Sequence, residues 1–282
     1  MNDKDKIMTR SPSLRRPFWF LFLLFSVAFS VNTQAAQASE YWAVWDGGDE
    51  GFRKTVNHQN WQDILDEYLV VHSAGNTFRY QAVSQADREK LKDYLSRLST
   101  VEPLSYSKAE QKAFWINLYN ALTVDLILKN YPLESITDIG PWYRFGPWDE
   151  KVITVAGLPL TLNDIEHRIL RPLWEDNRIH YAVNCASMGC PDLSPQVFTA
   201  ANTEQLLDKL ADRFVSQEKG VTWIDGRLVL SRIYEWYEVD FVDKDGVLLH
   251  LQKYARPDTA KKIKSHTGIV KYRYDWRLNE PQ

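Results

Sequence analysis

The chain has 282 residues, of which 44% are hydrophobic and 25% charged, and its formal net charge is −3. A mildly acidic chain whose one basic cluster is Lys261, Lys262 and Lys264 is a poor candidate for binding nucleic acid. The hydrophobic content suffices to bury a sizeable core.

Residues 1–38 have the three-part layout of a secretory signal peptide. Residues 1–16 contain five basic residues against two acidic ones, an apolar run follows at 17–30, and a small-residue stretch ends in Ala36-Gln37-Ala38. The run is shorter than the roughly 20 residues that a bilayer span needs. We therefore expect cleavage after Ala38, with an uncleaved anchor as the alternative. The mature chain would be periplasmic or secreted, without a stable membrane span, and its net charge would be −6 because the leader carries three net positive charges.

Two helices are predicted early in the mature chain. Residues 59–71 and 84–98 have helical spacing of apolar side chains, and Ser84 is a candidate N-cap for the second. We assign residues 39–104 to a helical lead-in and residues 105–282 to the core of the same globular unit.

Residues 107–130 are predicted to form a central, buried helix. Ser107 and Glu110 fit a capping box at its start, and Pro132 prevents it from continuing. Apolar side chains surround the helix from residue 113 to residue 128, which indicates burial on all sides.

Asn117 and Asn120 lie three residues apart on one face of this helix. Buried amides need hydrogen-bond partners. We expect the two side chains to form a structural polar network or to brace the cysteine loop described below. The alternative is that one of them supplies an oxyanion donor.

The rest of the chain alternates hairpins, short helices and loops. The predicted elements are a hairpin at 152–160, a short helix at 161–171, a strand at 178–184, a helix near 202–218, a hairpin at 221–230, helical stretches in 231–264 and a strand at 269–276. This order predicts an α+β fold: a helix-rich single domain with a central buried helix and small antiparallel sheets or hairpins.

A loop rich in Pro, Gly and Trp is predicted at 138–149. Its aromatic side chains, Trp142 and Trp148 among them, suit a groove that binds a peptide or a glycan, and they suit a rigid core equally well. A peptide or glycan ligand of the cell envelope is therefore the partner that we expect.

Glu166 lies in the apolar stripe of the predicted helix 161–171, four residues after Leu162. Burial raises the pKa of a carboxyl group and suits it to proton transfer. The alternative is a carboxylate at the edge of the stripe that pairs with Arg168 or Arg171.

Two histidines accompany this carboxylate. His167 by itself is typical of a surface or core histidine. His180 lies on the predicted strand 178–184, where it shares a polar face with Arg178 and Asn184. That face could line a cleft, or it could be an exposed face of a sheet.

Cys185 and Cys190 are the sharpest feature of the sequence. Cys185 could be a nucleophile activated by a histidine. An extended strand would place His180 roughly 16 Å away and on the opposite face. His167 as the base, or Cys190 as the nucleophile on a folded-back loop, therefore fits better than a Cys185–His180 pair.

Two alternatives use the same cysteines without a nucleophile. After export the two thiols would meet an oxidising compartment and could form a Cys185–Cys190 disulfide, which in so short a loop stabilises by about 2 kcal/mol. A zinc site that adds His167 and His180 matches the usual ligand spacing only loosely, so we expect no metal.

Five segments resemble one family, the domain of unknown function 547. They are FWINLYNA (114–121), LNDIEHRILR (162–171), RIHYAVNCASMGCP (178–191), LSRIYEWYEVDF (230–241) and YDWRLN (274–279). The resemblance spans roughly residues 105–279, and the two cysteines with the upstream Ile-His pair are its most specific part. It implies a site among the signature residues Glu166, His167, His180, Asn184, Cys185, Ser187, Cys190 and Pro191, and it implies no particular activity.

Three functional hypotheses follow. The first is an envelope thiol hydrolase or acyl transferase acting on a peptide or a glycan-linked amide, with Cys185 as nucleophile, His167 or His180 as base, Glu166 as the orienting carboxylate and Asn117 or Asn184 as oxyanion donor. The second is a non-catalytic binding or scaffold domain whose Cys185–Cys190 disulfide fixes a recognition loop. The third is an enzyme that uses Glu166 and His180 as acid and base. Because the sequence contains no phosphate-binding or dinucleotide-binding fingerprint, we expect no cofactor.

Overall fold

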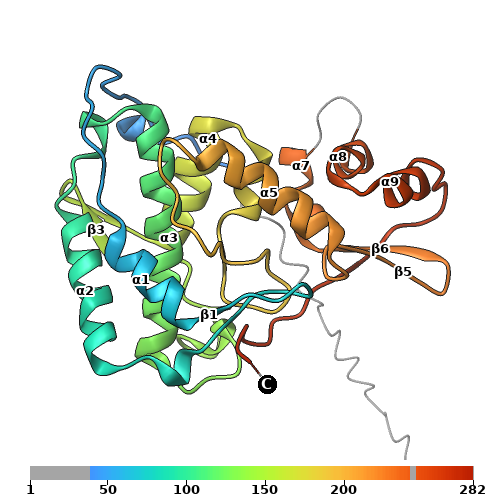
Figure 1. The fold of residues 1–282 in the computed structure, drawn as a ribbon, viewed down its shortest axis with the longest axis horizontal. Helices are drawn as coiled ribbons and strands as arrows, with labels where there is room; N and C mark the ends of the chain where they lie inside the picture. The colour runs from blue at the N-terminus through green and yellow to red at the C-terminus, as the bar shows by residue number, and fades with distance from the viewer. Residues whose placement is uncertain (1–38, 242–245, 282) are drawn as a thin grey trace, which may run out of the picture. The chain divides into compact units, whose positions relative to one another are not determined.

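The computed structural model describes residues 39–241 and 246–281 (Figure 1). Residues 1–38 lie outside the described part, so export and cleavage stay predictions. Among the described residues, no helix has both the length and the apolar character that a membrane span requires.

The central element is α3, Lys108–Asn130, and the prediction of a buried helix is confirmed. Every side chain from residue 110 to residue 128 is buried. The hydroxyl of Ser107 caps the helix by accepting a hydrogen bond from the backbone N–H of Glu110. The carboxylate of Glu110 accepts from the backbone N–H groups of Val56 and Ala200 and not from Ser107. This side chain therefore joins two distant segments to the start of α3.

Helices cover α3 on several sides. In Figure 1, α2 (Gln85–Ser99) stands on one side of α3 and α5 (Thr203–Ser216) on the other, and both contact it. The helix α1 (Gln59–Tyr68) packs against α2. Ser84 caps α2 as predicted, since its side chain accepts a hydrogen bond from the backbone of Asp87.

The strands are short and form three separate sheets in the described residues. They are β1 (Leu69–Val70) with β2 (Thr77–Phe78), β3 (Ile153–Val155) with β4 (Leu158–Leu160), and β5 (Val221–Ile224) with β6 (Arg227–Ser231) and β7 (Lys271–Arg273). Both predicted hairpins are confirmed. Asp225 and Gly226 form the turn of the second hairpin with φ angles of 50° and 74°, a backbone conformation that glycine adopts readily. The predicted strand 269–276 is shorter, and it pairs with β6 in parallel.

The described parts of the predicted helical region 231–264 contain four short helices. They are α6 (Ile233–Trp236), α7 (Glu238–Phe241), α8 (Val247–Tyr254) and α9 (Pro257–Lys264). Three-residue 3-10 turns lie at Ala43–Trp45, Tyr80–Ala82, Pro103–Ser105 and Ile136–Asp138.

The predicted strand 178–184 is wrong. Asn177–Tyr181 form a 3-10 helix, η6, whose first turn is capped by the carboxylate of Asp176. All side chains from residue 179 to residue 184 are buried, so the expected exposed polar face does not exist. Other elements enclose this turn, α5 among them.

The predicted helix 161–171 takes an unusual form. Asp164–Leu170 are a π-helix, η5, which continues into α4 (Arg171–Trp174). Short π-helical segments occur frequently at functional sites. This one places Glu166 and His167 in the interior, 5% and 4% exposed.

Candidate functional site

The two cysteines lie at either end of a loop that brings their sulfur atoms together. The Sγ atoms are 3.0 Å apart, and the backbone N–H of Cys185 donates a hydrogen bond to Sγ of Cys190. Both are free thiols in this structure. Cys185 is half-buried, whereas Cys190 is only 4% exposed. The pair therefore has one accessible and one enclosed member.

Two hydroxyl groups complete the surroundings of Cys185. Its sulfur lies 3.0 Å from Oη of Tyr274 and 3.2 Å from Oγ of Ser187, and these two hydroxyls are 2.9 Å apart. Ser187, a predicted site residue, thus contacts the sulfur directly. Tyr274 was not among the predicted site residues, although it begins the last segment that resembles the family.

The two thiols differ in acidity. Burial alone raises the pKa of Cys185, but hydrogen bonds from Cys190, Ser187 and Tyr274 outweigh it and lower the pKa to about 7. The pKa of Cys190 is raised by burial and by its hydrogen bond to Cys185. Burial, together with the nearby thiol charges, also raises the pKa of Tyr274, which therefore stays protonated and can donate to a thiolate.

Amide side chains hold the first half of the cysteine loop. Asn120 accepts from the backbone N–H of Asn184 and donates to the carbonyl of Ala182, so it braces the loop as predicted. The side chain of Asn184 bridges the loop by donating to Pro191 and accepting from Ala186. Its amide thus links the segment that follows Cys185 to the segment that follows Cys190.

Asn117 lies elsewhere. Its side chain donates to the carbonyl of Phe198 and accepts from the backbone N–H of the same residue, at 2.7 and 3.0 Å. Both ends of this amide are thus engaged by the segment that precedes α5.

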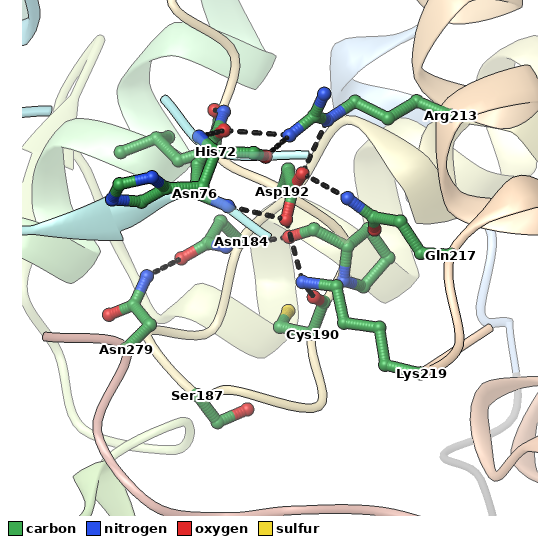
Figure 2. Close-up of polar contacts among 12 residues, drawn as sticks. His72, Asn76, Asn184, Ser187, Cys190, Asp192, Arg213, Gln217, Lys219 and Asn279 are labelled. Carbon is green, nitrogen blue, oxygen red and sulfur yellow. Dashed lines mark hydrogen bonds and ion pairs between the residues drawn. The ribbon is translucent and has the colours of Figure 1, made fainter. Parts of the chain in front are cut away.

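The second half of the loop is held by a buried carboxylate, Asp192 (Figure 2). Its side chain is 1% exposed and accepts hydrogen bonds from Arg213, Lys219 and Gln217 at 2.5, 2.6 and 2.6 Å. The ammonium of Lys219 also donates to the carbonyl of Cys190. Burial raises the pKa of Asp192, but the two cations and the amide lower it more, so that it remains ionised.

The C-terminal segment is joined to the cysteine loop by backbone hydrogen bonds. The backbone N–H of Gly189 donates to the carbonyl of Asp275, and that of Asn279 donates to Ala186. A Cβ atom at Gly189 would lie 2.6 Å from the backbone nitrogen of Asp275, so the approach requires glycine there.

A second cluster surrounds Glu166. Its Oε1 lies 3.7 Å from Nδ1 of His180 and 4.0 Å from Nδ1 of His167. Burial alone raises the pKa of Glu166, but the charges of His167, His180 and Arg171 lower it more, to about 2. The expected upward shift is therefore wrong, because the positive charges around the carboxylate outweigh its burial.

His180 is held from several directions. Its Nε2 lies 2.7 Å from Oδ2 of Asp240, its ring stacks on Tyr237 at 4.1 Å, and Asp240 also pairs with Arg171 at 2.5 Å. Nδ1 of His167 lies 3.1 Å from the Arg171 guanidinium, and burial lowers the pKa of His167 to about 4. His167 is therefore neutral near pH 7.

The two clusters are neighbours. The negative charge of Glu166 raises the pKa of Cys185, and the charges of Glu166 and both cysteines act on Tyr237 and Tyr119. Among the described residues, the hydrogen bonds of the Cys185 sulfur involve Cys190, Ser187 and Tyr274 and neither histidine.

Three other predicted binding residues lie outside both clusters. Arg178 forms ion pairs with Asp176, Glu204 and Asp208 at the surface. Trp142 is 95% exposed, and Trp148 is half-buried. No metal was expected at this site. Across residues 39–241 and 246–281, no group of three or more His, Cys, Asp or Glu side chains is arranged so that it could hold a metal ion.

Comparison with known families supports the resemblance for the three segments that lie before residue 215, whereas the segments 230–241 and 274–279 lie outside the match. The model of the family described as "Protein of unknown function, DUF547" matches residues 103–215, which include α3, η5 and both cysteines. No curated protein and no solved structure matches the chain. Residues 103–215 are therefore a DUF547 segment, and the description of that family assigns no function.

Proposed function

We propose that this chain is an exported thiol enzyme of the cell envelope that works by thiol–disulfide exchange, with Cys185 as nucleophile and Cys190 as its partner thiol. The observation that carries the proposal is the unequal burial of two sulfur atoms that lie 3.0 Å apart. In such a pair the accessible thiol attacks the substrate, and the enclosed thiol resolves the intermediate.

The surroundings of Cys185 support this role. A pKa of about 7 leaves roughly half of the residue as thiolate at pH 7, which is near the optimum for an attacking thiol. The hydroxyls of Ser187 and Tyr274 can both donate to that thiolate.

The exchange balances without a further reactant. The Cys185 thiolate attacks one sulfur of a substrate disulfide, forms a mixed disulfide and expels the other sulfur as a thiolate, which takes a proton from water. Cys190 loses its proton and attacks Sγ of Cys185, which expels the second substrate thiol and leaves a Cys185–Cys190 disulfide. Two electrons pass from the cysteine pair to the substrate, and the reverse sequence oxidises a substrate dithiol.

The chain contains only two cysteines, so each serine variant isolates one thiol. With excess 5,5′-dithiobis(2-nitrobenzoate), Cys190→Ser should keep a stable mixed disulfide between Cys185 and thionitrobenzoate. In the wild-type protein, Cys190 should expel the thionitrobenzoate and form the intramolecular disulfide. Cys185→Ser should react at least about tenfold more slowly, because the remaining thiol is buried and less acidic. Equal rates for the two variants would refute the proposal.

The carboxylate–imidazole cluster favours a second candidate, acyl transfer from a peptide or a glycan-linked amide. His180 lies between Glu166 and Asp240, and the charge of Glu166 acts on Cys185. Here Cys185 would attack the amide carbon, form a thioester and release the amine, and water or an acceptor amine would then take the acyl group.

The partner thiol separates the candidates. Cys190→Ser should abolish multiple turnovers of disulfide exchange and leave acyl transfer intact. His180→Gln should slow acyl transfer more strongly than it slows disulfide exchange. A Cys185–Cys190 disulfide that resists millimolar dithiothreitol would instead support the third interpretation, a binding domain whose disulfide fixes a recognition loop.

A further inference from the structure

The surface beside Cys185 is built from aromatic rings. Tyr274, whose hydroxyl contacts the Cys185 sulfur, packs against Trp236 and Trp276 with ring centroids 4.8 and 4.6 Å away. Trp276 in turn meets Phe145 at 5.0 Å. The contacts thus run from the nucleophile toward the loop that contains Phe145.

Five residues form this aromatic strip: Phe145, Trp148, Trp236, Tyr274 and Trp276. None of them is fully buried, and Phe145 is 44% exposed. Each ring is held by at least one neighbouring ring, so little side-chain freedom remains to be lost when a ligand binds. Rigid, partly exposed aromatic side chains of this kind are typical of recognition surfaces.

The charges at the edge of the strip pair with one another. Arg277 forms an ion pair with Asp275 at 2.5 Å, and Arg144 forms one with Glu150 at 3.7 Å. The strip therefore offers flat apolar rings flanked by compensated charges, which favours uncharged side chains over charged ones.

We propose that the aromatic strip binds a polypeptide substrate, as an extended segment whose aromatic or apolar side chains lie on the rings and bring a cystine sulfur to Cys185. This inference rests on the proposed thiol–disulfide exchange. The strip ends at the residue that contacts the reactive sulfur, so a molecule that reacts there must also cover Tyr274. A disulfide substrate with apolar flanks is, in chemical terms, an unfolded or partly folded polypeptide.

The test compares three disulfides on the same protein. They are bis(2-hydroxyethyl) disulfide, a cystine peptide with phenylalanine on both sides of each cysteine, and the same peptide with serine in place of phenylalanine. The wild-type protein should prefer the phenylalanine peptide in kcat/KM. Phe145→Ala should lower kcat/KM for that peptide about five- to tenfold more than it lowers kcat/KM for the hydroxyethyl disulfide, since one aromatic contact is lost. Tyr41→Ala, which removes a 55% exposed aromatic side chain outside the strip, is the matched control and should change neither.

Failure of the inference and failure of the proposed function can be distinguished. Equal kcat/KM for the two peptides in the wild-type protein would overturn the strip as a polypeptide site while leaving exchange in place. If no disulfide reacts, binding of the phenylalanine peptide to Cys185→Ser, and its weakening by Phe145→Ala, would still support the strip. Binding of a chitin oligosaccharide that Phe145→Ala weakens, without any binding of the peptide, would overturn the inference in favour of a glycan.

Discussion

Replacement of Asp192 by alanine tests the main support of the cysteine loop. The carboxylate is 1% exposed and lies 2.5 Å from Nε of Arg213 and 2.6 Å from Nζ of Lys219. Its removal leaves two cations facing each other across a small cavity. The hydrogen bond from the Lys219 ammonium to the carbonyl of Cys190 would also weaken, because Asp192 would no longer hold the ammonium in place.

The expected loss follows from the geometry. Removal of one partner from a buried ion pair costs about 3–5 kcal/mol. The side chains of Arg213 and Lys219 are 29% and 16% exposed, so water can partly restore their solvation, and about 3 kcal/mol is the appropriate value. For a domain of this size, with a urea m-value of about 3 kcal/mol/M, the midpoint of unfolding should fall by about 1 M.

Urea unfolding followed by fluorescence measures this difference. Asp212→Ala, which removes an exposed carboxylate one residue from Arg213 on α5, is the matched control and should stay within about 0.5 kcal/mol of the wild type. The double variant Asp192→Ala/Lys219→Met should recover part of the loss, because it removes one of the two positive charges that would otherwise repel each other. A loss below about 1 kcal/mol with an unchanged m-value would refute the assignment of Asp192 as the support of the loop.

Three further predictions concern acidity and packing. Iodoacetamide labelling of Cys185 in the reduced protein should be half-maximal near pH 7, and Tyr274→Phe should move this midpoint upward because a hydrogen bond to the thiolate is lost. Gly189→Ala should cost about 1–3 kcal/mol in urea unfolding because its methyl group would meet the backbone, whereas Gly47→Ala, with ordinary space, should be near neutral. Burial lowers the pKa of His58 to about 4, so the unfolded chain takes up a proton between pH 6.5 and 4 that the folded chain does not. The free energy of unfolding should therefore fall by up to about 3 kcal/mol over that window, and His58→Gln should flatten the decline measured at pH 7.5 and 4.5.

Elements with local signals could be predicted from the sequence. Ser84 and Ser107 cap the helices that they were expected to begin, and Asp225 and Gly226 form the expected turn. These signals depend on neighbouring residues alone, so they survive in the folded chain. The prediction of a strand at 178–184 was wrong because the alternation of apolar and polar residues carries no information about which elements surround the segment. The cap from Asp176 favours a helical turn there.

The candidate site was predicted only in part, because some of its contacts join residues that are far apart in the sequence. Glu166 and His180 were expected to act together, and they lie 3.7 Å apart, whereas an extended strand was expected to hold His180 roughly 16 Å from Cys185. Asp240 contacts His180 across 60 residues, and Tyr274 contacts Cys185 across 89. No periodicity or spacing connects such pairs, although both lie in segments that resemble the family. The wrong sign for the pKa of Glu166 has a different origin: His167, Arg171 and His180 are close in sequence, but only the fold shows that their charges outweigh burial.

The Glu166 carboxylate offers the sharpest distinction between the two enzymatic candidates. Its negative charge raises the pKa of Cys185, while the hydroxyls and Cys190 lower it. Glu166→Gln removes the charge and keeps the shape, so the pKa of Cys185 should fall below 7 and labelling at pH 6 should become faster. Glu67→Gln, at an exposed position, should leave the labelling rate unchanged.

The two mechanisms then require opposite results from the same variant. Disulfide exchange uses the thiolate alone, so Glu166→Gln should retain or increase exchange at pH 6, provided that circular dichroism shows an intact fold. Acyl transfer uses the carboxylate to orient His180, and there the variant should lose most of its activity. Slower labelling of a folded Glu166→Gln protein would contradict both expectations, because it would mean that the carboxylate stabilises the thiolate through a contact other than direct charge.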